Sequence, residues 1–162
     1  MINVIADLSA GNLIIEDIKY PISCNVRSLA NGNRKRDEVV LSIPDGKPYD
    51  PRPFPKGKWK ITAVEWLQMK DGKESFSSTV YGWVKIRTDA YQPVDVWSLD
   101  LDGDYLEETD RQVTDTGYLI HYSMSRTTLG CIRAYSPNEI DIYAKYFEQV
   151  LSQEGPIPLE VI

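Results

Sequence analysis

The sequence predicts a mainly β fold of the α+β class with one prominent helix near the C-terminus. In residues 18–26, and again in 80–86, every even position is apolar or glycine, the period of a half-buried strand. A capped, amphipathic helix pattern then begins at Ser136. The chain has 162 residues, of which 42% are apolar, so one domain over 1–162 is expected.

Further strand patterns follow the same alternation along the chain. Pro21 cannot donate to a ladder, so its strand is expected at a sheet edge or at a bulge. Asp71 and Gly72 are expected to form a hairpin tip. The predicted strands lie near residues 18–26, 39–43, 59–63, 80–86, 94–97, 118–123 and 157–161.

The helix pattern has a defined start and end. Ser136, Pro137 and Glu139 fit a capping box with proline at the first helical position. Apolar residues follow at intervals of three and four, and Gly155 ends the helix before a proline.

Charge is unevenly distributed. The net charge is −6 overall, with −7 over residues 95–115 and +6 over 19–60. This balance disfavours general nucleic-acid binding, which requires a basic face. The acids at 100–107 lack the full calcium-loop pattern, so an exposed acidic hairpin is expected. Five prolines in residues 44–57 predict a long ordered loop, either a rim over a site or a solvated loop.

Several classes of protein are excluded by composition. No apolar run is long enough to span a bilayer, and no secretory signal is visible at the start of the chain. Two cysteines cannot form a disulfide framework, and Cys24 is expected to be a small buried apolar residue. One histidine and two cysteines exclude the usual four-ligand His/Cys zinc site, so neither metal nor cofactor is expected.

Residues 120–133 carry the candidate chemistry. His121 is the only histidine, and it lies ten residues before Cys131. A thiol nucleophile needs a base near neutral pH and donors for an oxyanion, which His121 and the backbone around Gly130 can supply. Arg126 and Arg133 are expected to favour the thiolate and to bind a substrate carboxylate. The alternative is a structural histidine and a small buried cysteine.

The segment Thr128–Arg133 resembles the Ser/Thr-x-Gly-Cys-Ile-Arg signature of the L,D-transpeptidase (YkuD-like) catalytic domain. The pair Ile120–His121 is similar to the family's strand-ending Ile-His, and residues 55–61 are similar to its Pro-x-Gly-x-aromatic-x-Ile segment. The resemblance covers roughly residues 12–150. Tyr122 stands where the family usually has glycine, and the His-to-Cys spacing is shorter than is typical.

The resemblance implies an L,D-transpeptidase-like β-sandwich or barrel that acts on peptidoglycan stem peptides. Cys131 would attack the carbonyl of the third stem residue, and His121 would serve as base and then as acid toward the departing D-alanine. Transpeptidation, D-amino-acid exchange and L,D-carboxypeptidase activity stay open. A backbone carbonyl or Ser123 would orient His121. The residues expected to contact substrate are Arg133, Tyr122, Arg126, Ser123, Thr128 and Tyr118.

The implied location is the periplasm or cell envelope. Because no signal is visible, the chain is expected to be a processed form or to be delivered without a cleaved signal, as a secreted effector or a phage-encoded enzyme would be. Export machinery or an immunity protein would then be partners. Two alternatives are a non-catalytic peptidoglycan-binding domain of the same fold and a phage or structural domain.

Overall fold

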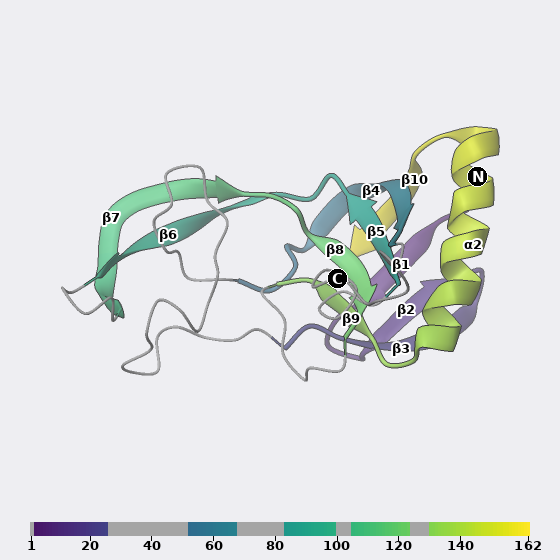
Figure 1. The fold of residues 1–162 in the computed structure, drawn as a ribbon, viewed down its shortest axis with the longest axis horizontal. Coiled ribbons are helices and arrows are strands. Elements are labelled where there is room, and N and C mark those ends of the chain that lie inside the picture. The colour runs from purple at the N-terminus through teal and green to yellow at the C-terminus, as the bar shows by residue number, and fades with distance from the viewer. Residues whose placement is uncertain (1, 26–51, 68–82, 100–104, 124–129) are drawn as a thin grey trace, which may run out of the picture.

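The computed structural model describes residues 2–25, 52–67, 83–99, 105–123 and 130–162. Eight strands form a closed barrel in the order β1-β10-β4-β5-β8-β9-β3-β2 (Figure 1). The β1–β10 and β8–β9 pairs are parallel, and the other pairs in the barrel are antiparallel. The strands are β1 (Val4–Asp7), β2 (Asn12–Ile15), β3 (Ile18–Ser23), β4 (Gly57–Trp66), β5 (Val84–Thr88), β8 (Leu119–Tyr122), β9 (Ile132–Ala134) and β10 (Ile157–Val161).

Burial in the barrel interior determines which residues of β5, β8 and β9 face outward. Ile86, Ile120 and Ile132 lie on the neighbouring strands β5, β8 and β9, and all three are fully buried in one core cluster. Burial of each such side chain contributes roughly 1.5–3 kcal/mol, so a register slip that exposed them would be costly. Successive side chains alternate, and the residues on either side of these isoleucines therefore lie on the other face.

Helix α2 (Pro137–Glu154) packs against the same core. The side chain of Ser136 accepts a hydrogen bond from the Glu139 amide at 3.4 Å, and Pro137 occupies the first turn. At the other end, the Gly155 amide donates to the Leu151 carbonyl. The residues buried from this helix are Ile140, Tyr143, Ala144, Phe147 and Val150.

A two-stranded arm extends away from the barrel, on the side opposite α2 (Figure 1). Its strands are β6 (Gln92–Leu99) and β7 (Tyr105–Asp115), which pair antiparallel with two register shifts. The antiparallel pairing of β6 and β7 flanks the acidic hairpin that was expected at residues 100–107. Its tip, residues 100–104, lies outside the described residues. After β7 the chain passes through residues 116–118 into β8.

The predicted fold class, mainly β with one C-terminal helix, is confirmed. Strands also lie at six of the predicted places, in β3, β4, β5, β6, β8 and β10. Pro21 pairs with Asn12 of β2, and the β3–β9 pairing on its other side covers just Ile22 and Ser23. Proline therefore stands where no ladder bond to β9 is required.

Three strands of the barrel escaped the sequence analysis: β1, β2 and β9. Each is four residues or shorter, so alternation has too little length to be recognised in it. The predicted strand at 39–43, the hairpin tip at 71–72 and residues 44–51 of the predicted loop lie outside the described residues. Residues 52–56 form no regular element, in line with the loop prediction.

Candidate active site

The parallel pair β8–β9 positions the two residues of the predicted chemistry. Ile120 pairs with Ile132 in register, and both point into the core. Cys131 directly precedes β9, and the Leu119 amide donates a hydrogen bond to its Sγ at 3.4 Å. His121 lies two residues beyond Leu119 on β8, roughly 7 Å further along the strand. Alternation places Cys131 and His121 on one face, opposite the two isoleucines.

We call this surface the site face: the outward face of β5, β8 and β9 that carries Lys85, His121, Arg133 and the adjoining Cys131. The three residues on the strands are aligned by register, since Lys85 pairs with His121 and His121 pairs with Arg133. Within the described residues, the buried polar and charged side chains are Asp115, His121 and Ser123. All three belong to β7, β8 or the residue after β8, so buried polarity is concentrated beside this face.

His121 is held as a neutral imidazole. Its side chain is 4% exposed, and Nδ1 lies 3.1 Å from the Tyr122 carbonyl oxygen. Because a carbonyl accepts, Nδ1 donates, and the ring lone pair is on Nε2. Burial lowers the pKa of His121 to about 4, and the charges of Lys85 and Arg133 act in the same direction against the opposing hydrogen bond. At neutral pH His121 is therefore unprotonated on Nε2.

The Tyr122 carbonyl answers one question that the sequence left open. Either a backbone carbonyl or Ser123 was expected to orient His121, and the Tyr122 carbonyl is one partner of its ring. The Ser123 carbonyl accepts instead from Nε of Arg133 at 2.7 Å. The backbone after β8 thus fixes both the imidazole and the guanidinium.

Cys131 is a protonated thiol in this environment. Burial raises its pKa to about 12, and the neighbouring charges of Cys24 and Asp115 raise it further. The Leu119 amide and Lys85 act in the opposite direction without reversing the shift. The expectation that nearby arginines would favour the thiolate is therefore wrong for Arg133. Burial has the largest effect on the pKa of Cys131, and Lys85 is the cation whose charge lowers it.

Gly130 meets a steric requirement beside the thiol. Its φ is +112°, a conformation that favours glycine. A Cβ there would collide with the Arg52 carbonyl oxygen and lie 2.9 Å from Cε1 of Tyr118. The backbone of residues 52–54 therefore packs directly on the residue that precedes Cys131, and no larger side chain fits.

Cys24 links the same segments. Its Sγ donates to the Gly130 carbonyl at 3.3 Å and accepts from the Phe54 amide at 3.3 Å. Burial raises the pKa of Cys24 as well. The side chain is half-buried against the core, which agrees with the expected apolar role but adds a bridging role that the sequence did not indicate.

The residues expected to contact substrate lie in different places. Tyr118 is 2% exposed, its ring packs edge-on against Phe54, and its hydroxyl accepts from Gln92 Nε2 at 2.8 Å. The structure thus places Tyr118 in the core rather than on a groove wall. Tyr122 is half-buried against the core on the face opposite His121, because it follows His121 on β8.

Among the remaining expected contacts, Arg133 and Ser123 lie at the site face, and Ser123 is buried. The guanidinium of Arg133 also stacks over the Tyr135 ring, with Cζ 4.9 Å from the centroid. Arg126 and Thr128 lie outside the described residues, so their placement is not part of the site described here. Sequence reasoning missed Lys85, since a lysine in an alternating strand carries no signal of what lies on the next strand.

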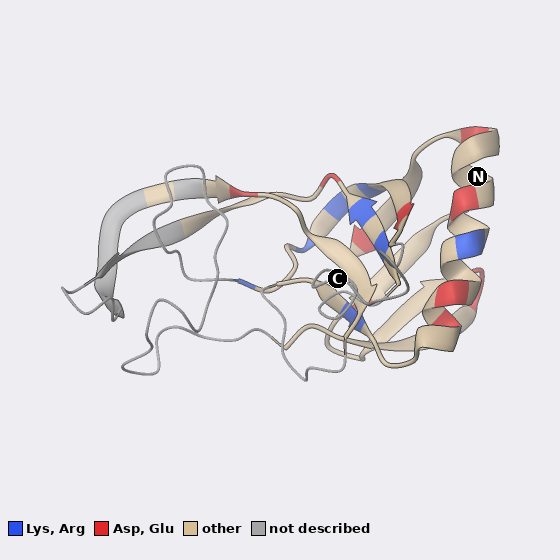
Figure 2. Ribbon diagram, viewed as in Figure 1, with Lys and Arg blue, Asp and Glu red and all other residues tan. Residues whose placement is uncertain are grey.

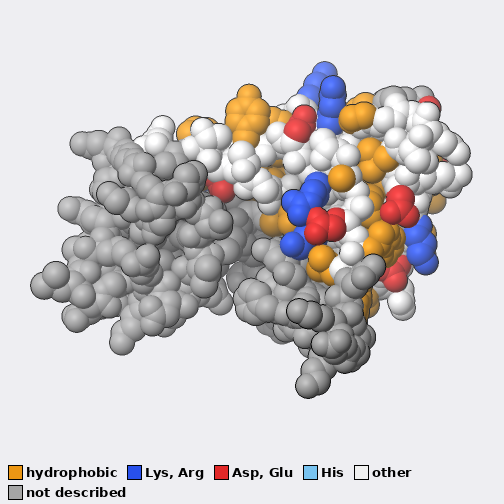
Figure 3. All heavy atoms as spheres, turned by 45° about the horizontal axis from the view of Figure 1, so that its top comes forward, with side chains coloured by type: hydrophobic (Ala, Val, Ile, Leu, Met, Phe, Trp, Pro, Cys, Tyr) orange, Lys and Arg blue, Asp and Glu red, His pale blue; other side chains and the backbone are white. Residues whose placement is uncertain are grey.

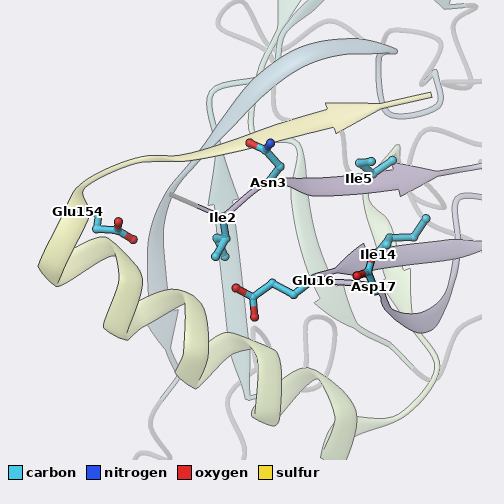
Figure 4. Close-up of a pocket in the computed structure, with 7 residues that line it drawn as sticks. All are labelled: Ile2, Asn3, Ile5, Ile14, Glu16, Asp17 and Glu154. Atoms are coloured by element: carbon cyan, nitrogen blue, oxygen red, sulfur yellow. The ribbon is translucent and has the colours of Figure 1, made fainter.

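A separate cavity of about 550 Å³ lies away from the site face (Figure 4). We call it the acidic pocket. Glu16 and Asp17 reach it from the turn after β2, and Glu154 from the last turn of α2. Its other lining residues are Ile2, Asn3, Ile5 and Ile14. β1, which forms its floor, is four strands from β8 in either direction around the barrel.

Charge on the described surface is mixed. Basic positions lie along β4 and β5, and acidic positions are spaced along α2 (Figure 2). Figure 3 shows Lys and Arg side chains directly beside Asp and Glu side chains on the face it draws. One such contact is the ion pair of Arg87 with Glu65, both of which are exposed. In the described part of the chain, no helix is long and apolar enough to cross a membrane.

Comparison with known proteins gives a structural likeness. The crystal structure of L,D-transpeptidase 1 from Mycobacterium tuberculosis is similar, with a TM-score of 0.43 and 18% sequence identity. The alignment covers 99% of this chain and 58% of that chain, so this chain spans less than two thirds of the other protein's length. No protein-family model matches the sequence, and a search of curated proteins gave no match.

Proposed function

We propose that residues 1–162 form a single cysteine-dependent acyl-transfer domain that acts on peptidoglycan stem peptides in the cell envelope. The observation that carries the proposal is the placement of Cys131 and His121 on one face of two adjacent strands. The signature residues Gly130, Cys131 and Arg133 occur together in that strand segment. Gly130, which immediately precedes the proposed nucleophile, has a φ of +112° and packs closely against Arg52 and Tyr118.

The reaction begins with a proton transfer. In the resting site the thiol of Cys131 points toward the Gly117 carbonyl oxygen, 3.9 Å from Sγ. In the proposed step, Nε2 of His121 accepts the thiol proton as Sγ attacks the substrate carbonyl carbon. The carbon–nitrogen bond then breaks, the departing amine of D-alanine takes the proton from His121, and a thioester remains on Cys131.

The second half of the reaction regenerates the thiol. A water molecule, or the amine of a second stem peptide, gives a proton to His121 and attacks the thioester carbonyl. The carbon–sulfur bond breaks, and Sγ recovers the proton from His121. Water yields a tripeptide carboxylate, and an amine yields a new amide bond.

The proposal is tested by intact-protein mass after exposure to a carbapenem and by release of D-alanine from a tetrapeptide muropeptide. We expect one covalent adduct and D-alanine release for the wild type, and neither for Cys131→Ala. Cys24→Ser retains a donor to Gly130 and should still be acylated, which locates the adduct. A wild-type protein that forms no adduct and releases no D-alanine overturns the proposal.

One observation favours a second candidate, a non-catalytic peptidoglycan-binding or phage structural domain of the same fold. The pKa of Cys131 is about 12, so the resting thiol is far from the thiolate that attacks. In that case muropeptides would bind without turnover, and binding would survive in Cys131→Ala. Turnover by the wild type excludes this candidate.

A further inference from the structure

Cys24 lies where two segments of the chain meet beside the proposed nucleophile. It directly follows β3, and its side chain packs against the core cluster. Its Sγ lies 3.3 Å from the Gly130 carbonyl oxygen and 3.3 Å from the Phe54 amide nitrogen. Because Gly130 immediately precedes Cys131, the Cys24 thiol is bonded to the peptide unit that joins those two residues.

The two partners of Cys24 determine where its proton lies. A backbone amide only donates, and a carbonyl oxygen only accepts. The Phe54 amide therefore donates to Sγ, and the single thiol proton is directed to the Gly130 carbonyl. Phe54 is buried and its ring packs edge-on against Tyr118, so the residue that holds Sγ is itself held in the core. The thiol is thus a fixed donor to Gly130.

One hydrogen bond to the Gly130 carbonyl orients the whole peptide unit between Gly130 and Cys131. A peptide unit is planar, and this one is trans. In a trans peptide the C=O and N–H bonds point in opposite directions. The Gly130 carbonyl is turned to Cys24, which packs on the core, so the Cys131 N–H is turned away from Cys24.

Glycine at position 130 makes this orientation easy to lose. Without a Cβ, glycine adopts backbone conformations that other residues exclude, so the peptide unit that follows it can rotate more readily. Rotation by half a turn would exchange the two ends of the unit. The carbonyl oxygen would then point away from Cys24, where the amide hydrogen now points. Its partial negative charge would oppose the charge that develops on the substrate carbonyl oxygen as Sγ attacks.

We propose that Cys24 is a positioning residue that prevents this rotation and keeps the Gly130 carbonyl oxygen turned away from the oxyanion formed when Cys131 attacks. This inference rests on the proposed function. It gives the second cysteine of the chain a role in the acylation step that involves no contact with the substrate.

The test compares two reactions of Cys131. Acylation by a carbapenem passes through a tetrahedral oxyanion, whereas alkylation by iodoacetamide displaces iodide at a saturated carbon and forms none. Both reactions need the same thiolate, so the ratio of their rates at Cys131 isolates stabilisation of the oxyanion. Peptide mapping assigns both modifications to Cys131.

Two substitutions at Cys24 give opposite expectations. Cys24→Ala removes the donor to Gly130, and the ratio of acylation to alkylation should fall at least about tenfold, since one group at an oxyanion changes the rate by about 10²–10³. Cys24→Ser retains a donor and should keep the ratio within about threefold of the wild type.

Ser23→Ala is the matched control. Ser23 precedes Cys24 at the end of β3, and within the described residues its buried hydroxyl has no hydrogen-bond partner. Its removal therefore perturbs the same strand without releasing Gly130, and the ratio should be unchanged. A purely structural role for Cys24 would change both rates in the same proportion in Cys24→Ala, and that result overturns the inference.

An NMR measurement separates this inference from the proposed function. Gly130 and Cys131 form the only Gly-Cys pair in the sequence, so carbon-13 at glycine carbonyls and nitrogen-15 at cysteine amides give a single correlation. The coupling between the Cys131 amide proton and Hα reports φ of Cys131, which changes when the peptide unit rotates. Loss of the S–H bond without rotation leaves this coupling as it is.

We expect a changed coupling or a second signal in Cys24→Ala, and the wild-type coupling in Cys24→Ser and Ser23→Ala. A single signal with an unchanged coupling in Cys24→Ala overturns the inference, even where the wild type is acylated. A wild type that forms no carbapenem adduct while the coupling changes in Cys24→Ala overturns the proposed function and leaves the orientation of the peptide by Cys24 established.

Discussion

The site face and the acidic pocket lie on opposite sides of one barrel and differ in how deeply their polar side chains are buried. On the site face, His121 and its neighbour Ser123 are buried, and the backbone holds both the imidazole and Arg133. In the acidic pocket, Glu16, Asp17 and Glu154 are all exposed around an apolar floor.

The comparison shows that burial, rather than the number of charges, determines the chemistry of a region. The pocket carries more charged side chains, but water around its carboxylates screens their interactions. The site face has fewer charges, and there burial shifts the pKa of His121 down to about 4 and that of Cys131 up to about 12.

The largest expected effect is steric. Gly130 adjoins Cys131, and Gly155 follows Glu154 at the rim of the acidic pocket; both have positive φ. A Cβ at Gly155 meets nothing within 4 Å, whereas one at Gly130 collides with backbone. Gly155→Ala should therefore cost about 1 to 2 kcal/mol from backbone conformation, and Gly130→Ala at least about 2 kcal/mol more.

Chemical denaturation of the two glycine variants measures this difference directly. Because both glycines have a positive φ, Gly155→Ala controls for the cost of a positive φ. Equal destabilisation by the two substitutions would show that the close approach of residues 52–54 to Gly130 is absent in solution.

The second prediction concerns acid stability. His121 has a pKa of about 4 when folded and 6.5 when unfolded, so protons bind preferentially to the unfolded chain as pH falls. Its contribution is fully present above about pH 6.5, is lost progressively toward pH 4, and changes no further below that. The loss should be about 3 kcal/mol in the free energy of unfolding.

Urea denaturation at pH 7 and at pH 4 gives this loss for the wild type and for His121→Gln, in which the titrating group is absent. The difference between the two pH dependences should be about 3 kcal/mol. Glu154→Gln, in the acidic pocket, retains His121 and should retain this difference too. Matching pH dependences of wild type and His121→Gln would contradict a buried neutral histidine.

The features of the fold that could be predicted from the sequence are those that depend on residues close together in the chain. The helix was predicted at both ends, because Ser136, Pro137 and Gly155 act within a few residues of one another. The pairing of His121 with Lys85 is set by strand order, which no local pattern encodes. β9 was missed for a related reason, since its three residues are defined by their partners on β8 and β3.

The candidate site shows the same division. The choice of His121 and Cys131 as a possible pair came from residue types and spacing, and the barrel brings them to one face. The pKa shift of Cys131 was predicted in the wrong direction, because a sequence shows nearby arginines but does not show burial. Tyr118 was expected on a groove wall for its residue type, and the close packing with Gly130 and Phe54 places it in the core.

The third prediction compares thiols in the two regions. Three pKa units separate Cys131, at about 12, from an ordinary cysteine at 9.0, so its thiolate is about a thousandfold rarer at neutral pH. Greater intrinsic nucleophilicity recovers part of this, which leaves alkylation roughly 30-fold slower. Asn3→Cys places an exposed thiol in the acidic pocket and should react with iodoacetamide at least about tenfold faster than Cys131. Peptide mapping of the alkylated protein resolves the two rates. Equal rates would mean that the Cys131 thiol is accessible to solvent.

The smallest expected effect is a test of independence between the regions. Glu16→Gln and Glu154→Gln each remove one charge from the acidic pocket, four strands from β8 around the barrel. Because these side chains are exposed, salt at physiological strength screens them over about 8 Å. Release of D-alanine should therefore stay within about twofold of the wild type in both variants. A tenfold change in the rate of D-alanine release in either glutamate variant would mean that the two sides of the barrel are energetically coupled and act as one connected site.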